Sequence, residues 1–131
     1  MKKVLGMGAA LVDILVNVDD SWIESQGVTK GGMNMVEWPQ MKKFLSGIEN
    51  PLRVPGGSTC NTMVGLAKLG GRAAFISKVA DDELGRLFQK HLNDSNVESK
   101  MGITDVATGC CLSAVTPDGQ RSMWSFLGAS N

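Results

Sequence analysis

Short apolar runs alternate with segments of helical periodicity along most of this chain. Continuous apolar runs predict strands at residues 2–8, 11–18 and 73–80, and residues 51–57 read as extended. Helical spacing predicts helices at residues 20–26, 37–45, 58–69 and, after the capping pair Asp81–Asp82, through Leu92. Strands that alternate with helices are typical of an α/β fold with a mainly parallel sheet.

Two regions depart from this alternation. Residues 108–116 and 120–128 read as strands joined by a hairpin turn at Pro117-Asp118-Gly119, and residues 28–36 are rich in glycine and methionine and read as extended. These segments could form a separate small sheet. In the 58–69 helix we expect the apolar face to consist of Met63, Leu66, Ala67 and Leu69.

Composition and charge narrow the function classes. The 131 residues suffice for one domain, and 13 basic residues balance 13 acidic ones without a basic run, which argues against nucleic-acid binding. No apolar run approaches the roughly 20 residues of a membrane helix. Gly6, Gly8 and Asp13 interrupt the N-terminal apolar region too early for a signal peptide, so we expect a cytoplasmic protein. The eight methionines are expected to fill gaps in the core.

The three cysteines, Cys60, Cys110 and Cys111, fit neither a disulfide framework nor a zinc spacing. We therefore expect buried thiols and no metal site. A Walker phosphate loop is absent. The stretch "GMGAAL" offers two glycines of a dinucleotide loop, but Leu11 occupies the third position and a strand, rather than a helix, is predicted to follow.

The stretch "VPGGSTCN" at residues 54–61 has two interpretations. Gly56 and Gly57 would let the backbone approach a ligand, the helix start would offer free N–H groups, and the Asn61 amide would both donate to and accept from a hydroxyl. Alternatively, the glycines form a turn and Ser58 or Thr59 caps the helix, which is the commoner use of such a spacing.

Asp13 lies inside an apolar strand, where a carboxylate is costly unless it is paired or belongs to a site. A carboxylate can accept hydrogen bonds from two neighbouring hydroxyls, so Asp13 and Asn61 together would bind a polyol. The alternative, an exposed turn residue, remains equally open at this point.

Three stretches resemble a known family. They are "GMGAALVDI", "PGGSTCNTMVGLAKLGGRAAFISKVADDELGRLF" and "TGCCLSAVTPDGQRSMWSFLGASN", and they are similar to the N-terminal part of PfkB, or ribokinase-like, carbohydrate kinases, with an adenosine kinase-like character. The resemblance implies an α/β fold with a ribokinase-like doubly wound sheet, of which residues 1–131 are the N-terminal portion. It also implies a small β lid, from strands near 28–36 and 108–127.

The implied activity is phosphorylation of a small-molecule sugar or nucleoside hydroxyl by ATP with Mg²⁺. By position, Asp13, Gly56, Gly57 and Asn61 resemble the family's substrate-binding residues, and Ser58 joins them. The resemblance further suggests contacts from the lid side by Met33, Met35, Cys111, Met123, Ser125 and Leu127.

The chain departs from the family in two respects. It lacks the Gly-Ala-Gly-Asp motif that holds the transferring phosphoryl group and the general base, so we expect no catalytic residue, no ATP or Mg²⁺ site and no activity in this chain alone. Met33 stands where adenosine kinases place a polar residue, which leaves the choice of sugar or nucleoside open. The alternative is a non-catalytic α/β binding or dimerisation module. A homodimer through the lid or an exposed sheet edge is a further expectation.

Overall fold

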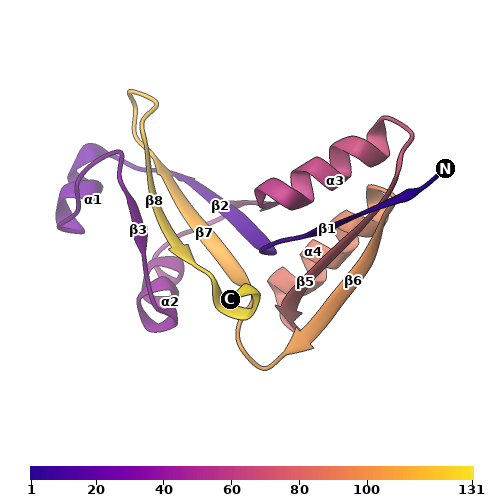
Figure 1. The fold of residues 1–131 in the computed structure, drawn as a ribbon. Helices are drawn as coiled ribbons and strands as arrows, with labels where there is room; N and C mark the ends of the chain where they lie inside the picture. Colours follow the sequence, from indigo (N-terminus) through magenta and orange to yellow (C-terminus); the bar gives the residue numbers. More distant parts are fainter. The chain divides into compact units, whose positions relative to one another are not determined.

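A computed structural model describes residues 1–131 and shows the mixed α/β fold that the sequence predicts (Figure 1). The strands are β1 Lys3–Met7, β2 Leu11–Asn17, β3 Met33–Met35, β4 Leu52–Gly56, β5 Arg72–Ala80, β6 Val97–Thr104, β7 Gly109–Val115 and β8 Arg121–Phe126. The helices are α1 Asp20–Ser25, α2 Trp38–Ser46, α3 Ser58–Lys68 and α4 Glu83–Asp94, with the short 3₁₀ helix η1 at Gly128–Ser130.

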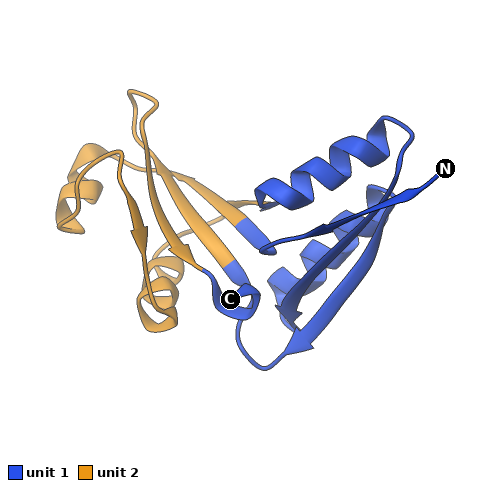
Figure 2. Ribbon diagram, viewed as in Figure 1, with its two compact units in different colours: residues 1–12, 55–109, 127–131 blue, residues 13–54, 110–126 orange.

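The chain divides into two compact units (Figure 2). Unit 1 comprises residues 1–12, 55–109 and 127–131, and unit 2 comprises residues 13–54 and 110–126. Each unit therefore combines segments that are far apart in the sequence.

Unit 1 is built on a parallel three-stranded sheet in the order β1-β5-β6. Gly6 of β1 pairs with Phe75 of β5, so both residues point to the same face. On that face, a Cβ at Gly6 would lie 2.8 Å from the Met63 side chain of α3, and Phe75 stacks on Phe88 of α4 with ring centroids 6.0 Å apart. Helices α3 and α4 thus cover one face of this sheet.

Asp82 fastens the start of α4 to Thr108, the residue directly before β7. Its carboxylate accepts hydrogen bonds from Gly85 N at 2.8 Å, Thr108 N at 3.0 Å and Thr108 Oγ1 at 2.7 Å. The fully buried Thr108 hydroxyl accepts in turn from Ala80 N at 2.9 Å. The predicted helix cap is confirmed here, and the same side chain also anchors the chain that leads into β7.

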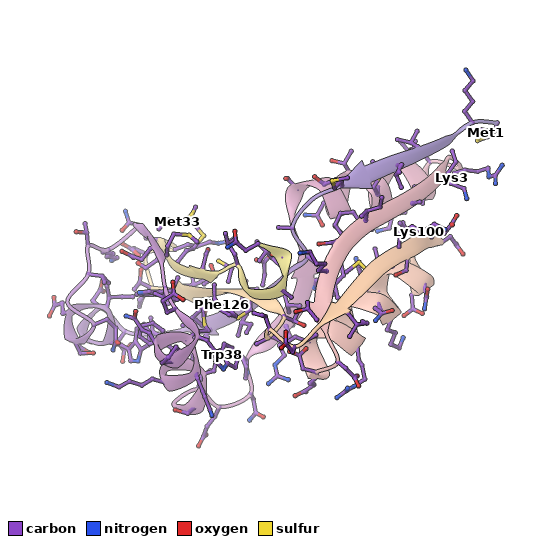
Figure 3. The ribbon with its side chains drawn as sticks, turned by 60° about the horizontal axis from the view of Figure 1, so that its bottom comes forward. Met1, Lys3, Met33, Trp38, Lys100 and Phe126 are labelled. Carbon is purple, nitrogen blue, oxygen red and sulfur yellow. The ribbon has the colours of Figure 1, made fainter.

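Unit 2 contains most of a five-stranded sheet in the order β3-β8-β7-β2-β4. The predicted hairpin and the Met33–Met35 strand share this sheet, and β2 and β4 join it. Trp124 of β8 packs against Trp22 of α1 and Phe44 of α2, with ring centroids 5.6 Å and 5.4 Å away. Trp38 packs against Phe126 at 5.2 Å (Figure 3). One face of the sheet is therefore covered by α1 and α2.

Several sequence expectations are corrected by the structure. Strand β6 is absent from the predicted elements, because Glu98, Lys100 and Gly102 interrupt its apolar pattern and its order comes from backbone pairing with β5. Leu69 is 88% exposed, because α3 ends at Lys68 and Leu69 leaves the helical face. Neither Ser58 nor Thr59 caps α3, since both lie inside the helix and Gly57 occupies the N-cap position.

The methionines fill the core only in part. Met41 and Met63 are buried, whereas Met7, Met33 and Met35 are exposed. All three cysteines are buried thiols, and burial raises the pKa of Cys60 to about 11. None of the helices has the length and apolar character that crossing a membrane requires.

Candidate functional site

The candidate residues of unit 2 lie on the sheet face opposite α1 and α2. Trp124 faces the helices, so its neighbours Met123 and Ser125 point the other way. The strand register places Met35 beside Ser125 and Ser125 beside Cys111, and Cys111 interacts electrostatically with Asp13. These four side chains form a row across the sheet, which we call the Asp13 row: Asp13, Cys111, Ser125 and Met35.

Asp13 lies in β2, where the alternation of Val12 and Ile14 toward the core turns its carboxylate to the opposite face. Burial raises the pKa of Asp13 above its usual value, and the Arg121 guanidinium opposes part of this rise. No hydrogen bond or ion pair within the chain engages the carboxylate. Asp13 is thus a partly desolvated acceptor whose hydrogen-bonding capacity is unused within the chain.

Cys111 and Ser125 form the middle of the Asp13 row. The Ser125 hydroxyl donates to Cys111 Sγ at 3.3 Å, and both residues are buried. Burial raises the pKa of the Cys111 thiol, the hydrogen bond from Ser125 lowers it, and the nearby Asp13 raises it further. Cys111 is therefore a neutral thiol rather than a reactive thiolate.

A second row follows one step along the strands. Ser113 pairs with Met123 and Met123 pairs with Met33, so the three side chains point to the same face as the Asp13 row. We call them the Met33 row. Met33 and Met35 are 66% and 62% exposed, and Figure 3 shows Met33 on the side of β8 away from Trp38.

Sequence reasoning missed two residues of this face, Ser113 and Arg121. Arg121 precedes Met123 by two positions on β8, and Ser113 follows Cys111 by two positions on β7. The period of two in a strand would have placed both beside the predicted residues.

The glycine turn belongs to unit 1. Gly56 ends β4 and is buried. Gly57 has φ +92, a backbone conformation that residues with a side chain rarely adopt. A Cβ at Gly57 would lie 2.7 Å from the Ala9 carbonyl oxygen. No side chain caps α3, so its first N–H groups have no intrahelical partner. Ser58 and Asn61 are exposed at this helix start.

The glycines of "GMGAAL" have a packing role in unit 1. A Cβ at Gly8 would lie 2.6 Å from Thr59 Oγ1, so β1 and α3 can approach closely only with glycine at this position. Residues 11–17 form strand β2 as predicted. A dinucleotide loop would require a helix there.

Leu127 lies beyond the end of β8 and belongs to unit 1, whereas the other five predicted lid residues belong to unit 2. No group of three or more acidic, histidine or cysteine side chains could hold a metal ion. A hollow of about 820 Å³ in unit 2 is lined by none of the predicted residues. Its lining includes Asn17, Asp19, Trp22, Glu49, Asn50 and Leu52.

Solved structures match nearly the whole chain, as two examples show. The adenosine kinase from Sinorhizobium meliloti is 39% identical with a TM-score of 0.83, and covers 98% of this chain and 40% of its own. The probable sugar kinase from Rhizobium etli CFN 42 is 34% identical with a TM-score of 0.84, and covers 98% of this chain and 39% of its own. The ribokinase-like fold that the sequence predicts is confirmed.

Curated relatives give a consistent result. Probable fructokinase-7 from Arabidopsis thaliana is 37% identical over 100 residues, which are 75% of this chain and 26% of that protein. Fructokinase-1 from Oryza sativa subsp. japonica is 32% identical over 104 residues, 78% of this chain and 29% of that protein. The chain thus spans little more than a quarter of these relatives. The family model described as pfkB family carbohydrate kinase matches residues 44–131, and the chain belongs to this family.

Proposed function

We propose that this chain supplies the acceptor-binding portion of an ATP-dependent kinase that phosphorylates a sugar or nucleoside hydroxyl. The observation that carries the proposal is the Asp13 carboxylate, which is partly desolvated and has no hydrogen-bond partner in the chain. Such a group gains a favourable interaction when hydroxyls donate to its oxygens, and hydrogen bonds to a charged acceptor are the stronger kind. Family membership supports the same chemistry.

The Gly57 turn makes a second contribution to acceptor binding in this proposal. Its uncapped helix start offers N–H donors, and the exposed Asn61 amide can donate and accept at once. Gly57 keeps the backbone free of a side chain at this point. We assign Gly56 and Ser58 to the same element. We retain Met33, Met35, Cys111, Met123, Ser125 and Leu127 as proposed contacts from the lid.

Phosphoryl transfer requires positioning of the acceptor and electrostatic stabilisation of the transferring group. Kinases of this family use ATP, with Mg²⁺ as the usual metal ion. Residues 1–131 contain neither Gly-Ala-Gly-Asp nor a cluster of side chains that could hold a metal ion. We therefore propose that the general base and the nucleotide site belong to a longer parent protein.

The chain alone is expected to show no turnover. A coupled assay of ATP consumption with ribose, fructose and adenosine as acceptors tests this expectation, with an intact family member as the positive control. Phosphorylated product formed by the 131-residue chain would contradict the assignment of the catalytic residues to the parent.

Acceptor binding is tested separately from catalysis. Titration calorimetry of the chain with the same three compounds is expected to show binding that Asp13→Asn weakens about tenfold, because a charge-assisted hydrogen bond is replaced by a neutral one. Glu24→Gln, an exposed carboxylate of unit 2, is the matched control and should leave affinity unchanged. Equal affinities for the wild-type chain and Asp13→Asn would contradict the role of Asp13.

A non-catalytic α/β binding or dimerisation module is the second candidate, because residues 1–131 have the family's fold without the Gly-Ala-Gly-Asp motif. The gene sequence beyond Asn131 distinguishes the candidates. A continuing reading frame that encodes Gly-Ala-Gly-Asp supports the kinase, whereas a natural stop codon shortly after Asn131 supports the module.

A further inference from the structure

Strand β6 is an open edge of the unit 1 sheet. The order β1-β5-β6 leaves one side of β6 without a neighbouring strand, as Figure 1 shows. Its pairing with β5 continues without interruption from Val97 to Thr104, and no proline interrupts the strand. An edge of this kind offers a row of backbone N–H and C=O groups to another strand.

Two charged side chains of opposite sign, Glu98 and Lys100, lie on this edge strand. Glu98 aligns with Ala74 of β5, whereas Phe75, the next residue of β5, points to the helices. Glu98 and Lys100 therefore both point to the face that α3 and α4 leave open. Their side chains are 37% and 55% exposed. Charges on an edge strand commonly keep further strands away, but opposite signs can also match those of a second copy.

Glu98 is held in place by two lysines of its own chain. Lys3 Nζ contacts one carboxylate oxygen, and Lys100 Nζ lies 2.6 Å from the other. Figure 3 shows Lys3 and Lys100 at the same end of the sheet. The charges of β6 are thus ordered before a partner arrives, which lowers the entropy cost of association. Exposed ion pairs add little stability, so their effect here is to select which residues face each other.

These charges select one way for two β6 strands to pair. A symmetric antiparallel pair is centred on one residue, so the helix-covered faces of both sheets stay on the same side. Centring the pair on Glu98 or on Lys100 places like charges directly opposite each other, which is destabilising. Centring it on Ser99 places Glu98 of each copy opposite Lys100 of the other. The same register places the apolar Val97 opposite Met101.

The other edge strand of this sheet, β1, lacks such complementarity. Lys3 is its only charged residue, and the exposed Leu5 and Met7 fit any apolar strand equally well. Association through β1 therefore selects no register.

We propose that β6 is a dimerisation edge whose partner is the β6 strand of a second copy of this chain, paired antiparallel about Ser99. The two three-stranded sheets then form one six-stranded sheet in the order β1-β5-β6-β6-β5-β1. Backbone hydrogen bonds supply the affinity, and the two contacts between Glu98 and Lys100 supply the register. The interface belongs to unit 1 and does not depend on the proposed acceptor binding.

A mixed disulfide tests the register directly. Chains with Glu98→Cys are mixed with chains with Lys100→Cys under mild oxidation, which leaves one of the two opposite-charge contacts intact. A disulfide-linked heterodimer is expected as the main product, because opposite Cβ atoms of an antiparallel pair lie about 4.5–5.5 Å apart. Each chain oxidised by itself should stay largely unlinked, since its new thiol then faces a charged side chain. The native cysteines are buried and do not compete.

Charge reversal makes the test quantitative. Glu98→Lys is expected to raise the dimer dissociation constant about tenfold in sedimentation equilibrium, because the two-fold axis repeats the like-charge contact. Adding Lys100→Glu should restore the affinity, since opposite charges face each other again. Repulsion between the new lysine and Lys3 is the same in monomer and dimer, so it does not affect this comparison.

Lys68→Glu reverses an exposed charge at the end of α3 in unit 1, and as the matched control it should leave the dissociation constant unchanged. Circular dichroism confirms that the variants fold.

Each outcome has a defined consequence. The heterodimeric disulfide together with rescue by Lys100→Glu supports the proposal. A mixture that crosslinks no better than either chain alone would overturn it, and so would a charge-reversal defect without rescue. Association that survives Glu98→Lys and decreases in Leu5→Lys would assign the contact to β1, and the proposed role of β6 would then be wrong.

Discussion

At the scale of single residues, Asp13 and Asp82 show that the environment can shift the pKa of a carboxyl group in either direction. Burial acts to raise both pKa values. Asp82 has hydrogen bonds from Thr108 and Gly85 that outweigh burial and lower its pKa, whereas Asp13 has none and its pKa stays raised. A satisfied carboxylate stabilises the fold, and an unsatisfied one is available to a ligand.

Asp82→Ala is expected to lower the free energy of unfolding by about 3 kcal/mol, because it removes a helix cap and leaves the Thr108 amide and hydroxyl without their shared partner. Asp81→Ala is the matched control. Asp81 pairs only with Arg86 at the surface, so its loss should cost less than about 0.5 kcal/mol. Urea denaturation measures the free energy of unfolding of both variants. Equal losses of this free energy would show that the hydrogen bonds of Asp82 do not stabilise the fold.

The same network predicts a pH dependence. Because the pKa of Asp82 is lowered in the folded chain, its stabilising contribution is fully present above the unfolded value of about 3.9 and is lost as pH falls through the lower folded value. The stability difference between wild type and Asp82→Asn should therefore shrink below about pH 4. A difference that grows on acidification would contradict the assigned cause.

For Asp13, the pH dependence of stability is expected to have the opposite sign. Its pKa is raised on folding, so the charged form opposes folding at neutral pH, and that penalty disappears as pH falls through the folded value. Asp13→Asn should raise the melting temperature slightly while it weakens acceptor binding, a combination that a purely structural residue would not show. Thermal denaturation at pH 7 with and without ligand provides the measurement. A melting temperature of Asp13→Asn below that of the wild-type chain would contradict the prediction.

At the scale of elements, α3 shows how glycines define both ends of a helix for different reasons. Gly57 precedes the helix and Gly70 follows it, with φ +92 and +85. Only Gly57 also lies against another backbone group, the Ala9 carbonyl. The start of α3 is thus constrained by packing as well as by conformation.

Gly57→Ala is therefore expected to cost about 3 kcal/mol or more, the sum of the left-handed conformation and the contact with Ala9. Gly70→Ala, with nothing within 4 Å of its Cβ, should cost only about 1–2 kcal/mol. Both substitutions lie in unit 1, so melting temperatures compare them directly. If Gly70→Ala proves the more damaging, close packing does not explain Gly57.

At the scale of the whole molecule, the sheet of unit 1 is covered by helices on one face only. Lys3, Leu5 and Met7 point to the other face, opposite Gly6, and Leu5 and Met7 are 56% and 75% exposed. Strand β1 is also an edge strand of this sheet. Exposed apolar edges of this kind favour association with other chains.

The 131-residue chain is accordingly expected to self-associate at high concentration, and Leu5→Lys should shift the equilibrium toward monomer because a charge on an edge strand opposes pairing. Leu69→Lys removes a leucine that is 88% exposed but lies outside the sheet, and should have little effect. Sedimentation velocity distinguishes these cases. A monomer at all concentrations would refute the expectation.

The sequence by itself determined most elements, because apolar periodicity and capping residues act locally: β2, α2 and the hairpin turn at Gly119 lie where the pattern places them. It also determined the family, since the "PGGSTCN" to "DDELG" stretch is specific. Strand β6 escaped prediction because its order comes from pairing with β5 rather than from its own pattern.

Only the tertiary structure decided which residues act together. Met35, Ser125 and Cys111 are distant in sequence, and the strand register alone places them in one row. The structure likewise decided that the glycines of "GMGAAL" serve packing against Thr59 and that Gly57, rather than Ser58, occupies the N-cap position of α3. Such facts depend on contacts between distant segments, which a local pattern of residues does not encode.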